Sequence, residues 1–163
     1  MTWTRVKAVA VLLLIPCLAV IARGQNKDAD SAAIKQVVAR FSEAFNHHDP
    51  QASATLFAED ADFTNMRGAS DHGRTEIEGL LKGLFSGRLK DAHRTDSVKK
   101  IRFLNPDIAL MDADWEMTGA KGADGEDVPL RKGLLDWVLT KQNGQWRITV
   151  FHESEFPGPA SAK

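Results

Sequence analysis

The sequence predicts an α+β domain in which helices from its first half pack on one face of a sheet from its second half. Apolar residues recur at helical spacing between residues 31 and 86, and apolar and polar residues alternate after residue 93. An Asn143-Gly144 pair joins the last two alternating segments, as in a hairpin. The length of 163 residues suits one domain, and 43% hydrophobic with 26% charged residues is a globular composition.

The first 24 residues have the pattern of a secretory signal peptide. Arg5 and Lys7 precede an apolar run from Ala8 to Ala22, and Gly24 follows as a small residue at the exit. The run has 15 residues and contains Pro16, whereas a membrane-spanning helix needs about 20 apolar residues. We therefore expect cleavage after Gly24 and export to the periplasm or the extracellular space, with an uncleaved anchor as the alternative.

The mature chain would consist of a domain over residues 25–156 and a flexible tail over 157–163. Loss of the signal leaves 18 basic against 22 acidic residues, a formal charge of −4 that argues against a nucleic-acid partner. The single cysteine, Cys17, leaves with the signal, and Pro16 disfavours lipid attachment at it. We expect no disulfide, no metal site and no cofactor, and no membrane contact after cleavage. The chain has no tyrosine, which excludes a phenol-based mechanism.

Three helices are predicted in the first half. An apolar stripe that includes Phe41 predicts a helix from about Ser31 to Asn46. The Asp49-Pro50 pair is typical of a helix start and predicts a short helix to Phe57. A capping box of Thr75 and Glu78 then begins a third helix, whose apolar residues are Ile77, Leu80, Leu81, Leu84 and Phe85.

Five strands are expected, the first of them short, from Asp62 to Met66, with Phe63 and Asn65 on one face. The others are His93–Leu104, Ile108–Thr118, Leu134–Lys141 and Gln145–Glu155, with a turn at 105–107 and a Gly-rich connection over 119–133. A two-residue turn at Asn143-Gly144 places Asp136 opposite Phe151, Val138 opposite Thr149 and Thr140 opposite Arg147. The other face then carries Leu135, Trp137, Leu139, Ile148, Val150 and His152, unless a β-bulge shifts the register.

Few residues offer chemistry on their own. Asp136 is a mid-strand carboxyl between two apolar residues. It either lines a pocket or has a structural role, in which it pairs with Arg147 or lies on an exposed face of the sheet. Trp115 and Trp137 can line a pocket but are more often core or interface residues. His47-His48-Asp49 is read as a solvated helix end, and residues 124–127 as an acidic turn without calcium-loop spacing.

Several segments together resemble the nuclear transport factor 2-like superfamily, and look closest to its SgcJ/EcaC and SnoaL-like branches. These segments are Phe41–Asp49, Leu56–Phe63, Gly73–Ile77, Asn143–Ile148 and Phe151–Ser154. The resemblance implies a cone-shaped fold in which three N-terminal helices pack on a curved antiparallel sheet around a pocket. It also implies a homodimer formed through the sheet. It leaves activity open, because this fold hosts enzymes and non-catalytic binding modules alike.

Carry-over from the similar ketosteroid isomerases is incomplete. Those enzymes use a tyrosine on the first helix, an aspartate on the first short strand that moves the proton, and a protonated aspartic acid on a late strand. The matching positions here are Phe41, Asn65 and Asp136. Phenylalanine donates no hydrogen bond and an amide is no useful base, so we reject isomerisation by that route. Asn65 could still orient a ligand carbonyl.

The ending Phe151–Ser154 is also similar to the association domain of calcium/calmodulin-dependent kinases, where an arginine at the Glu153 position helps to bind an anion. Glu153 reverses that charge, so we expect a neutral or apolar ligand.

Two functions therefore compete. The first is a small-molecule-binding protein whose pocket is lined by Phe41, Phe63, Asn65 and Trp115, with weak acid/base chemistry at Asp136, His152 and Glu153. The second is a non-catalytic dimer whose cone is filled with side chains. An oxidoreductase, as the SgcJ/EcaC label implies, is a third alternative, and whether the protein is an enzyme stays open.

Overall fold

The computed structural model describes residues 15–157, with side-chain exposure from residue 27 onward. The predicted signal segment lies outside the described residues up to residue 14, as does the tail from residue 158, so cleavage and tail flexibility stay predictions. Within the part of the chain that the structure describes, no helix has the length and apolar character needed to span a bilayer. The chain divides into two compact units, Met1–Ala33 and Ile34–Lys163, and the sheet and the site belong to the second.

Residues 15–157 form three helices and six strands. The helices are α1 (Ile15–Asn46), α2 (Pro50–Ala54) and α3 (Arg74–Ser86). The strands are β1 (Phe57–Thr64), β2 (Ser70–His72), β3 (His93–Asn105), β4 (Ile108–Thr118), β5 (Arg131–Gln142) and β6 (Gln145–Glu155). The predicted ends of β4 and β6 are confirmed, and so is the amphipathic third helix, which buries Ile77, Leu81 and Phe85.

The structure corrects the prediction in the segments before residue 80. Helix α1 begins at Ile15 rather than near Ser31, and α2 ends at Ala54 rather than at Phe57. Phe57 instead begins β1, because it pairs with Ile148 of β6, a partner far away in the sequence. The capping box predicted at Thr75 and Glu78 is wrong. Helix α3 starts two residues earlier, with Gly73 at the N-cap in place of Thr75. Gly73 has a φ of 83°, which suits glycine, and no side chain caps the helix.

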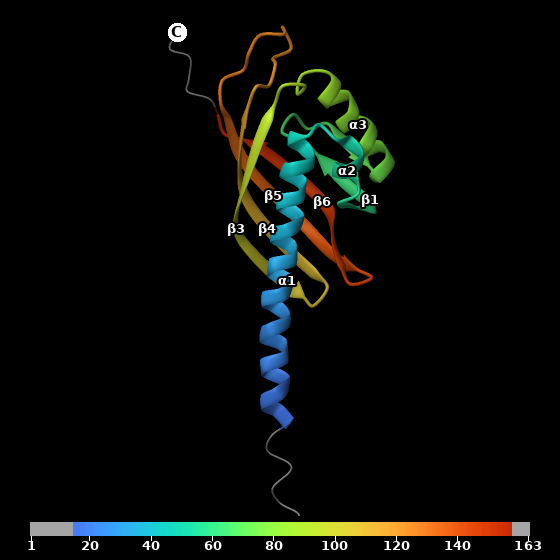
Figure 1. Cartoon of the computed structure of the whole chain (residues 1–163), viewed down its shortest axis with the longest axis vertical. Helices are drawn as coiled ribbons and strands as arrows, with labels where there is room; N and C mark the ends of the chain where they lie inside the picture. The colour runs from blue at the N-terminus through green and yellow to red at the C-terminus, as the bar shows by residue number, and fades with distance from the viewer. Residues whose placement is uncertain (1–14, 158–163) are drawn as a thin grey trace, which may run out of the picture. The chain divides into compact units, whose positions relative to one another are not determined.

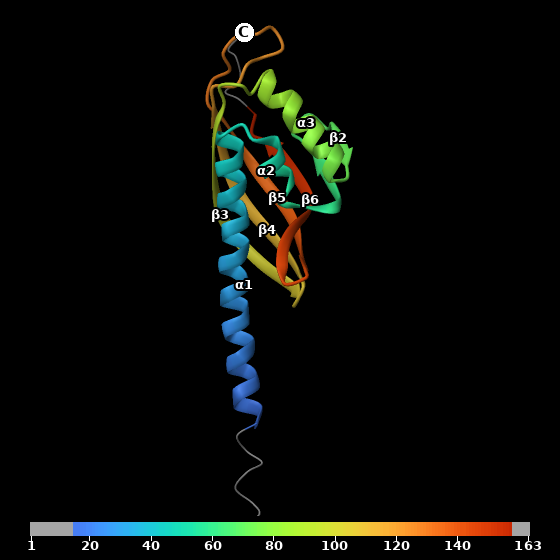
Figure 2. The ribbon, with the colours of Figure 1, turned by 45° about the vertical axis from the view of Figure 1, so that its right-hand side comes forward.

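The strands form one sheet in the order β2-β1-β6-β5-β4-β3. Neighbouring strands are antiparallel except β1 and β6, which run parallel, so the sheet is mixed rather than purely antiparallel as predicted. Figure 1 and Figure 2 show α3 and residues 34–46 of α1 on the same side of this sheet. Phenylalanine rings of α1 pack against the aromatic residues of the sheet. Phe41 lies 5.3 Å from Trp137 of β5 and 5.5 Å from Phe151 of β6, measured between ring centroids.

A β-bulge in the β5–β6 hairpin decides which side chains face the helices. The turn is as predicted, with positive φ at Asn143 (51°) and Gly144 (77°), and Thr140 pairs with Arg147. The register then shifts between Val138 and Leu139 of β5, so that Val138 pairs with Val150 instead of Thr149. Beyond this point every side chain of β6 lies on the opposite face from the predicted one.

The bulge changes which face of the sheet carries Phe151, His152 and Glu153 of β6, and it changes the partner of Asp136 in β5. Trp137, rather than Asp136, pairs with Phe151, and Asp136 pairs with His152. Phe151 and Glu153 are turned toward the helices, where the Phe151 side chain is buried. Asp136 and His152 are exposed on the outer face of the sheet. The predicted facing of Val150 and His152 toward the apolar side is therefore wrong.

Candidate functional site

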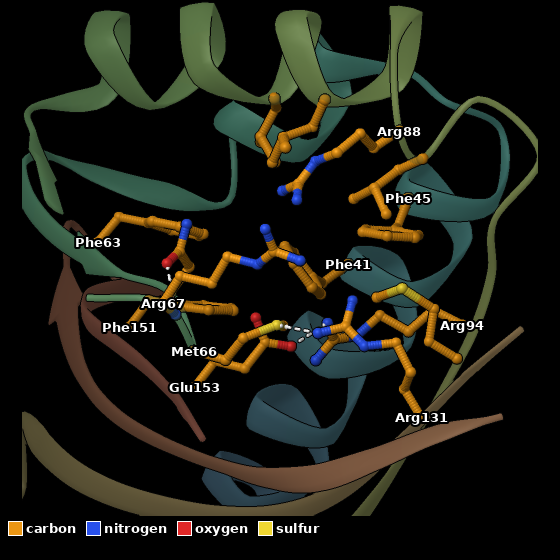
Figure 3. Close-up of a pocket in the computed structure, with 15 residues that line it drawn as sticks. Phe41, Phe45, Phe63, Met66, Arg67, Arg88, Arg94, Arg131, Phe151 and Glu153 are labelled. Atoms are coloured by element: carbon orange, nitrogen blue, oxygen red, sulfur yellow. Dashed lines mark hydrogen bonds and ion pairs between the residues drawn. The ribbon is translucent and has the colours of Figure 1, made fainter. Parts of the chain in front are cut away.

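A pocket lies between the helices and the inner face of the sheet, within the second unit of the chain (Figure 3). Its walls come from the end of α1, the turn after β1, the end of α3 and the ends of β3 to β6. The lining residues are Phe41, Phe45, Phe63, Asn65, Met66, Arg67, Leu81, Leu84, Arg88, Leu89, Arg94, Met117, Arg131, Phe151 and Glu153. Phe63 and Phe151 stack at 4.4 Å between centroids and form one apolar wall.

The pocket is small in this structure, with a cavity volume of about 40 Å³. A single water needs roughly 10–15 Å³ on this measure, and a cavity of about 150 Å³ admits benzene. The open space therefore fits a group of a few heavy atoms. A larger ligand needs side chains at the mouth to move, and Met66, Arg67 and Leu84 there have several rotatable bonds. Beside the cavity, the Phe41 ring packs against Phe57, Trp137 and Phe151.

The floor of the pocket is a buried ionic cluster centred on Arg94. The Arg94 side chain is 2% exposed, and those of Asp96 and Glu153 are 0% and 5% exposed. Arg94 Nε donates to Asp96 Oδ1 at 2.8 Å, and Arg94 Nη1 donates to Glu153 Oε1 at 2.7 Å. Ser42 Oγ of α1 donates to the other Asp96 oxygen at 2.7 Å. One guanidinium thus compensates two carboxylates, and the hydrogen bonds hold all three groups in place.

The backbone around Arg94 is held by the end of α1. The Asn46 side chain donates to the Arg94 carbonyl at 2.9 Å and accepts from the Arg94 N–H at 2.7 Å. An aromatic platform lies beneath, because the Trp115 ring is 5.2 Å from the Arg94 guanidinium carbon and 5.9 Å from that of Arg131. Trp115 Nε1 donates to the Ser154 carbonyl at 3.1 Å. Trp115 therefore supports the site from below and does not line it.

Glu153 is the acidic side chain that lines the pocket. Burial raises the pKa of Glu153, and the Asp96 carboxylate raises it further, whereas Arg94 opposes this shift. For Arg94 the balance is reversed: burial disfavours its charge, but Glu153 and Asp96 raise the pKa of Arg94. A carboxyl with a raised pKa inside a pocket is a candidate for proton transfer to or from a bound molecule.

Three further arginines border the pocket. Arg131 makes a bidentate pair with Glu155, at 2.7 Å and 2.6 Å, and contacts the Met66 sulfur. Arg67 and Arg88 make no ion pair with any residue that the structure describes. Burial lowers the pKa of Arg88, and the positive charges of Arg67 and Arg131 lower it further. The mouth therefore carries more positive than negative charge, with Glu155 paired to Arg131 and also within electrostatic reach of Arg67.

The sequence-predicted site residues are divided between two faces of the sheet. Phe41, Phe63, Asn65 and Glu153 line the pocket. Asn65 accepts from the backbone N–H groups of Arg67 at 2.8 Å and Ala69 at 3.2 Å, so its amide shapes the turn that carries Arg67. Asp136 and His152 lie on the outer face, away from the pocket. Arg147 contacts the Thr55 carbonyl and Gln145, and no ion pair joins it to Asp136 among the described residues.

Sequence reasoning missed all four pocket arginines. For Arg94 a signal was present, because Arg94 and Asp96 share the phase of Val98 in the first half of β3, before the register shift that follows Val98. A charged pair on an inward phase indicates a buried ion pair. Arg67 and Arg88 follow an element end in irregular segments, where no periodicity predicts the direction of a side chain. The expected exclusion of acidic ligands rested on Glu153 alone, and Arg94 offsets that charge.

Comparison with known proteins assigns the fold and the family. The model of the SnoaL-like domain matches residues 28–152. A protein with a cystatin-like fold from Nostoc punctiforme is 25% identical, with a TM-score of 0.71 over 80% of this chain and 79% of that one. A candidate scytalone dehydratase from Novosphingobium aromaticivorans is 17% identical, with a TM-score of 0.72 over 82% and 89% of the two chains. A ketosteroid isomerase-like protein from Erwinia carotovora atroseptica is 18% identical, with a TM-score of 0.65 over 78% and 96%.

The similarities to the candidate scytalone dehydratase and to the ketosteroid isomerase-like protein show the fold alone, because the identities are 17% and 18%. A search of curated proteins finds no significant match. The domain has the nuclear transport factor 2-like fold, as the resemblance in the sequence implied. Because the family model covers most of the chain, this protein belongs to the SnoaL-like domain family.

Proposed function

We propose that this chain is a small-molecule-binding protein that holds its ligand between the phenylalanine wall and the Arg94 cluster. The carrying observation is the pocket itself, which combines an apolar wall with a polar floor that is buried and hydrogen-bonded. Membership of the SnoaL-like family supports the proposal. So do the names of the similar structures, a candidate scytalone dehydratase and a ketosteroid isomerase-like protein, which both denote enzymes of small molecules.

Acid/base catalysis at Glu153 is the second candidate function. It is favoured by one observation, the buried carboxyl with a raised pKa in the pocket lining. In its ionised form Glu153 would accept a proton from a bound substrate and return it to another atom of that substrate. The route of the ketosteroid isomerases has no support, because Phe41 and Asn65 replace two of its groups and Asp136 lies on the outer face.

Export and dimerisation complete the proposal. Export is supported by the signal pattern of residues 1–24, and a homodimer through the sheet by the resemblance to the superfamily. Native mass spectrometry of the full chain, expressed with its export segment and purified from the exported fraction, tests both. We expect a dimer of chains that begin at Gln25. A monomer, or an uncleaved chain retained in the membrane fraction, would contradict them.

The ligand pocket is tested with a neutral fluorescent probe, N-phenyl-1-naphthylamine, whose emission rises in apolar surroundings. We expect saturable binding that Leu84→Trp weakens at least about tenfold, because Leu84 lines the pocket and the larger side chain fills it. Leu104→Trp is the matched control, since Leu104 is 57% exposed and lies outside the pocket. Binding that is absent in the wild type, or equally strong in Leu84→Trp, would remove the pocket from the proposal.

A further inference from the structure

We propose that the mouth of the pocket binds the carboxylate of an acidic small molecule between Arg67 and Arg88, with the apolar body of that molecule against the phenylalanine wall. This inference rests on the proposed function, because it names the class of ligand for the same pocket. It replaces the neutral ligand that the sequence led us to expect.

The charges around the pocket do not cancel at the mouth. Arg131 is matched by Glu155, and Arg94 by Asp96 and Glu153. Arg67 and Arg88 have no acidic partner within ion-pair distance among the described residues. Arg67 is exposed, so water solvates its charge. Arg88, however, is only partly exposed and lines the pocket, so a bound anion would replace the water it has lost.

The two side chains converge from different elements. Arg67 extends from the turn between β1 and β2, and Arg88 from the segment after α3. Figure 3 shows both guanidinium groups pointing toward the middle of the pocket from opposite sides. The positive charge of Arg67 helps to lower the pKa of Arg88, which places the two groups within electrostatic reach of one another. Two like charges that face a common space are stabilised by an anion between them.

A third donor is free at the floor of the same pocket. Arg94 Nη2 is buried and has no hydrogen-bond partner, although the other two donor atoms of this guanidinium are paired. Buried polar atoms are nearly always hydrogen-bonded in native proteins, so an unpaired one beside a cavity indicates a missing partner. Because Nη2 has almost no accessible surface, a ligand oxygen or a water reaches it only when the side chains around the cavity move.

A monocarboxylate fits these features better than a phosphate does. The planar fork of a guanidinium matches the two oxygens of a carboxylate, and the cavity of about 40 Å³ accommodates such a head group. A phosphate dianion would bring a second negative charge close to Glu153 and Asp96, which already share one arginine. The remaining walls are mostly Phe, Leu and Met, so the rest of the ligand is apolar.

The test compares benzoate with benzamide, which has nearly the same shape but no charge. Binding is measured by isothermal titration calorimetry on the full chain at low ionic strength, with wild type, Arg67→Gln, Arg88→Gln and Arg102→Gln. Arg102 is an exposed arginine of β3 outside the pocket, so its variant matches the change in net charge. We expect benzoate to bind about tenfold or more tightly than benzamide. Arg67→Gln and Arg88→Gln should each weaken benzoate about tenfold and leave benzamide unchanged, and Arg102→Gln should change neither.

Each other outcome overturns the carboxylate site. Equal affinities for benzoate and benzamide, or an equal loss in Arg102→Gln, would show that no specific pairing occurs, while the pocket of the proposed function would stand. Inorganic phosphate that displaces benzoate at equal concentration would show a general anion site instead. If neither aromatic compound binds, the carboxylate site is rejected, and the N-phenyl-1-naphthylamine result decides separately whether the pocket binds anything.

Discussion

The floor and the mouth of the pocket use the same residue type in opposite ways. At the floor, Arg94 is buried and paired with Asp96 and Glu153, so carboxylates of the protein itself compensate its charge. At the mouth, Arg67 and Arg88 line the same cavity without an acidic partner among the described residues. The difference shows that an arginine in a pocket is structural or available to a ligand according to its compensation, not its location.

The largest expected effect comes from breaking the floor. Arg94→Met leaves Asp96 and Glu153 buried without their cation, and we expect a loss of about 3–5 kcal/mol in the free energy of unfolding. Urea denaturation followed by tryptophan fluorescence measures it. Arg88→Met is the matched control, for which we expect a change within about 0.5 kcal/mol. Equal losses in the two variants would abolish the distinction between floor and mouth.

Glu153→Gln is expected to lower the free energy of unfolding by about 1 kcal/mol or less at neutral pH. Arg94 remains paired with Asp96, and the glutamine amide can still accept a hydrogen bond from Arg94. The pH dependence is more specific. Burial raises the pKa of Glu153 above its ordinary value of 4.5 in the folded protein, so the folded state holds this proton where the unfolded state has lost it. Wild-type stability should therefore fall relative to Glu153→Gln as the pH rises from 4.5 to the raised pKa, and the gap should then stay constant.

Urea titrations of both proteins across this pH range measure the gap between them. If the advantage of the wild type over Glu153→Gln instead stays constant above pH 4.5 and shrinks below it, Arg94 outweighs burial and the pKa of Glu153 is lowered.

A smaller effect is expected on the outer face of the sheet. Asp136 lies directly opposite Asp112 of β4, and like charges at paired positions destabilise a sheet. Asp136→Asn should raise the free energy of unfolding by up to about 0.5 kcal/mol and leave binding of N-phenyl-1-naphthylamine unchanged. Weaker probe binding in this variant would show that Asp136 takes part in the pocket, as the sequence analysis had proposed.

The smallest effect belongs to an exposed ion pair, the solvated counterpart of the floor. His72 Nδ1 of β2 lies 2.8 Å from Asp62 Oδ1 of β1, and this hydrogen bond together with the Asp62 charge raises the pKa of His72. An NMR titration should place that pKa above 6.5, and Asp62→Asn should bring it back toward 6.5. An unchanged value in the variant would show that the pair does not persist in solution.

Much of the fold follows from local patterns. The helical spacing from Ile77 to Phe85, the alternation in β4 and β6, and the Asn143-Gly144 turn each depend on neighbours in the chain. The start of β1 does not, because Phe57 extends only by pairing with Ile148. The same holds for the candidate site. Phe41 and Phe63 were predictable as apolar residues on inward faces, but nothing in the sequence near Arg67 or Arg88 indicates their common target.

By itself, the sequence determined the α+β class, the order of the elements apart from the short strand β2, the hairpin turn and the family, because periodicity and turn residues act over a few positions. Only the tertiary structure decided the identity of the pocket residues. One bulge in the last hairpin turned Glu153 inward and His152 outward, since a shift of one residue exchanges the faces of a strand. The pairing of Arg94 with Glu153, 59 positions apart, followed from that shift.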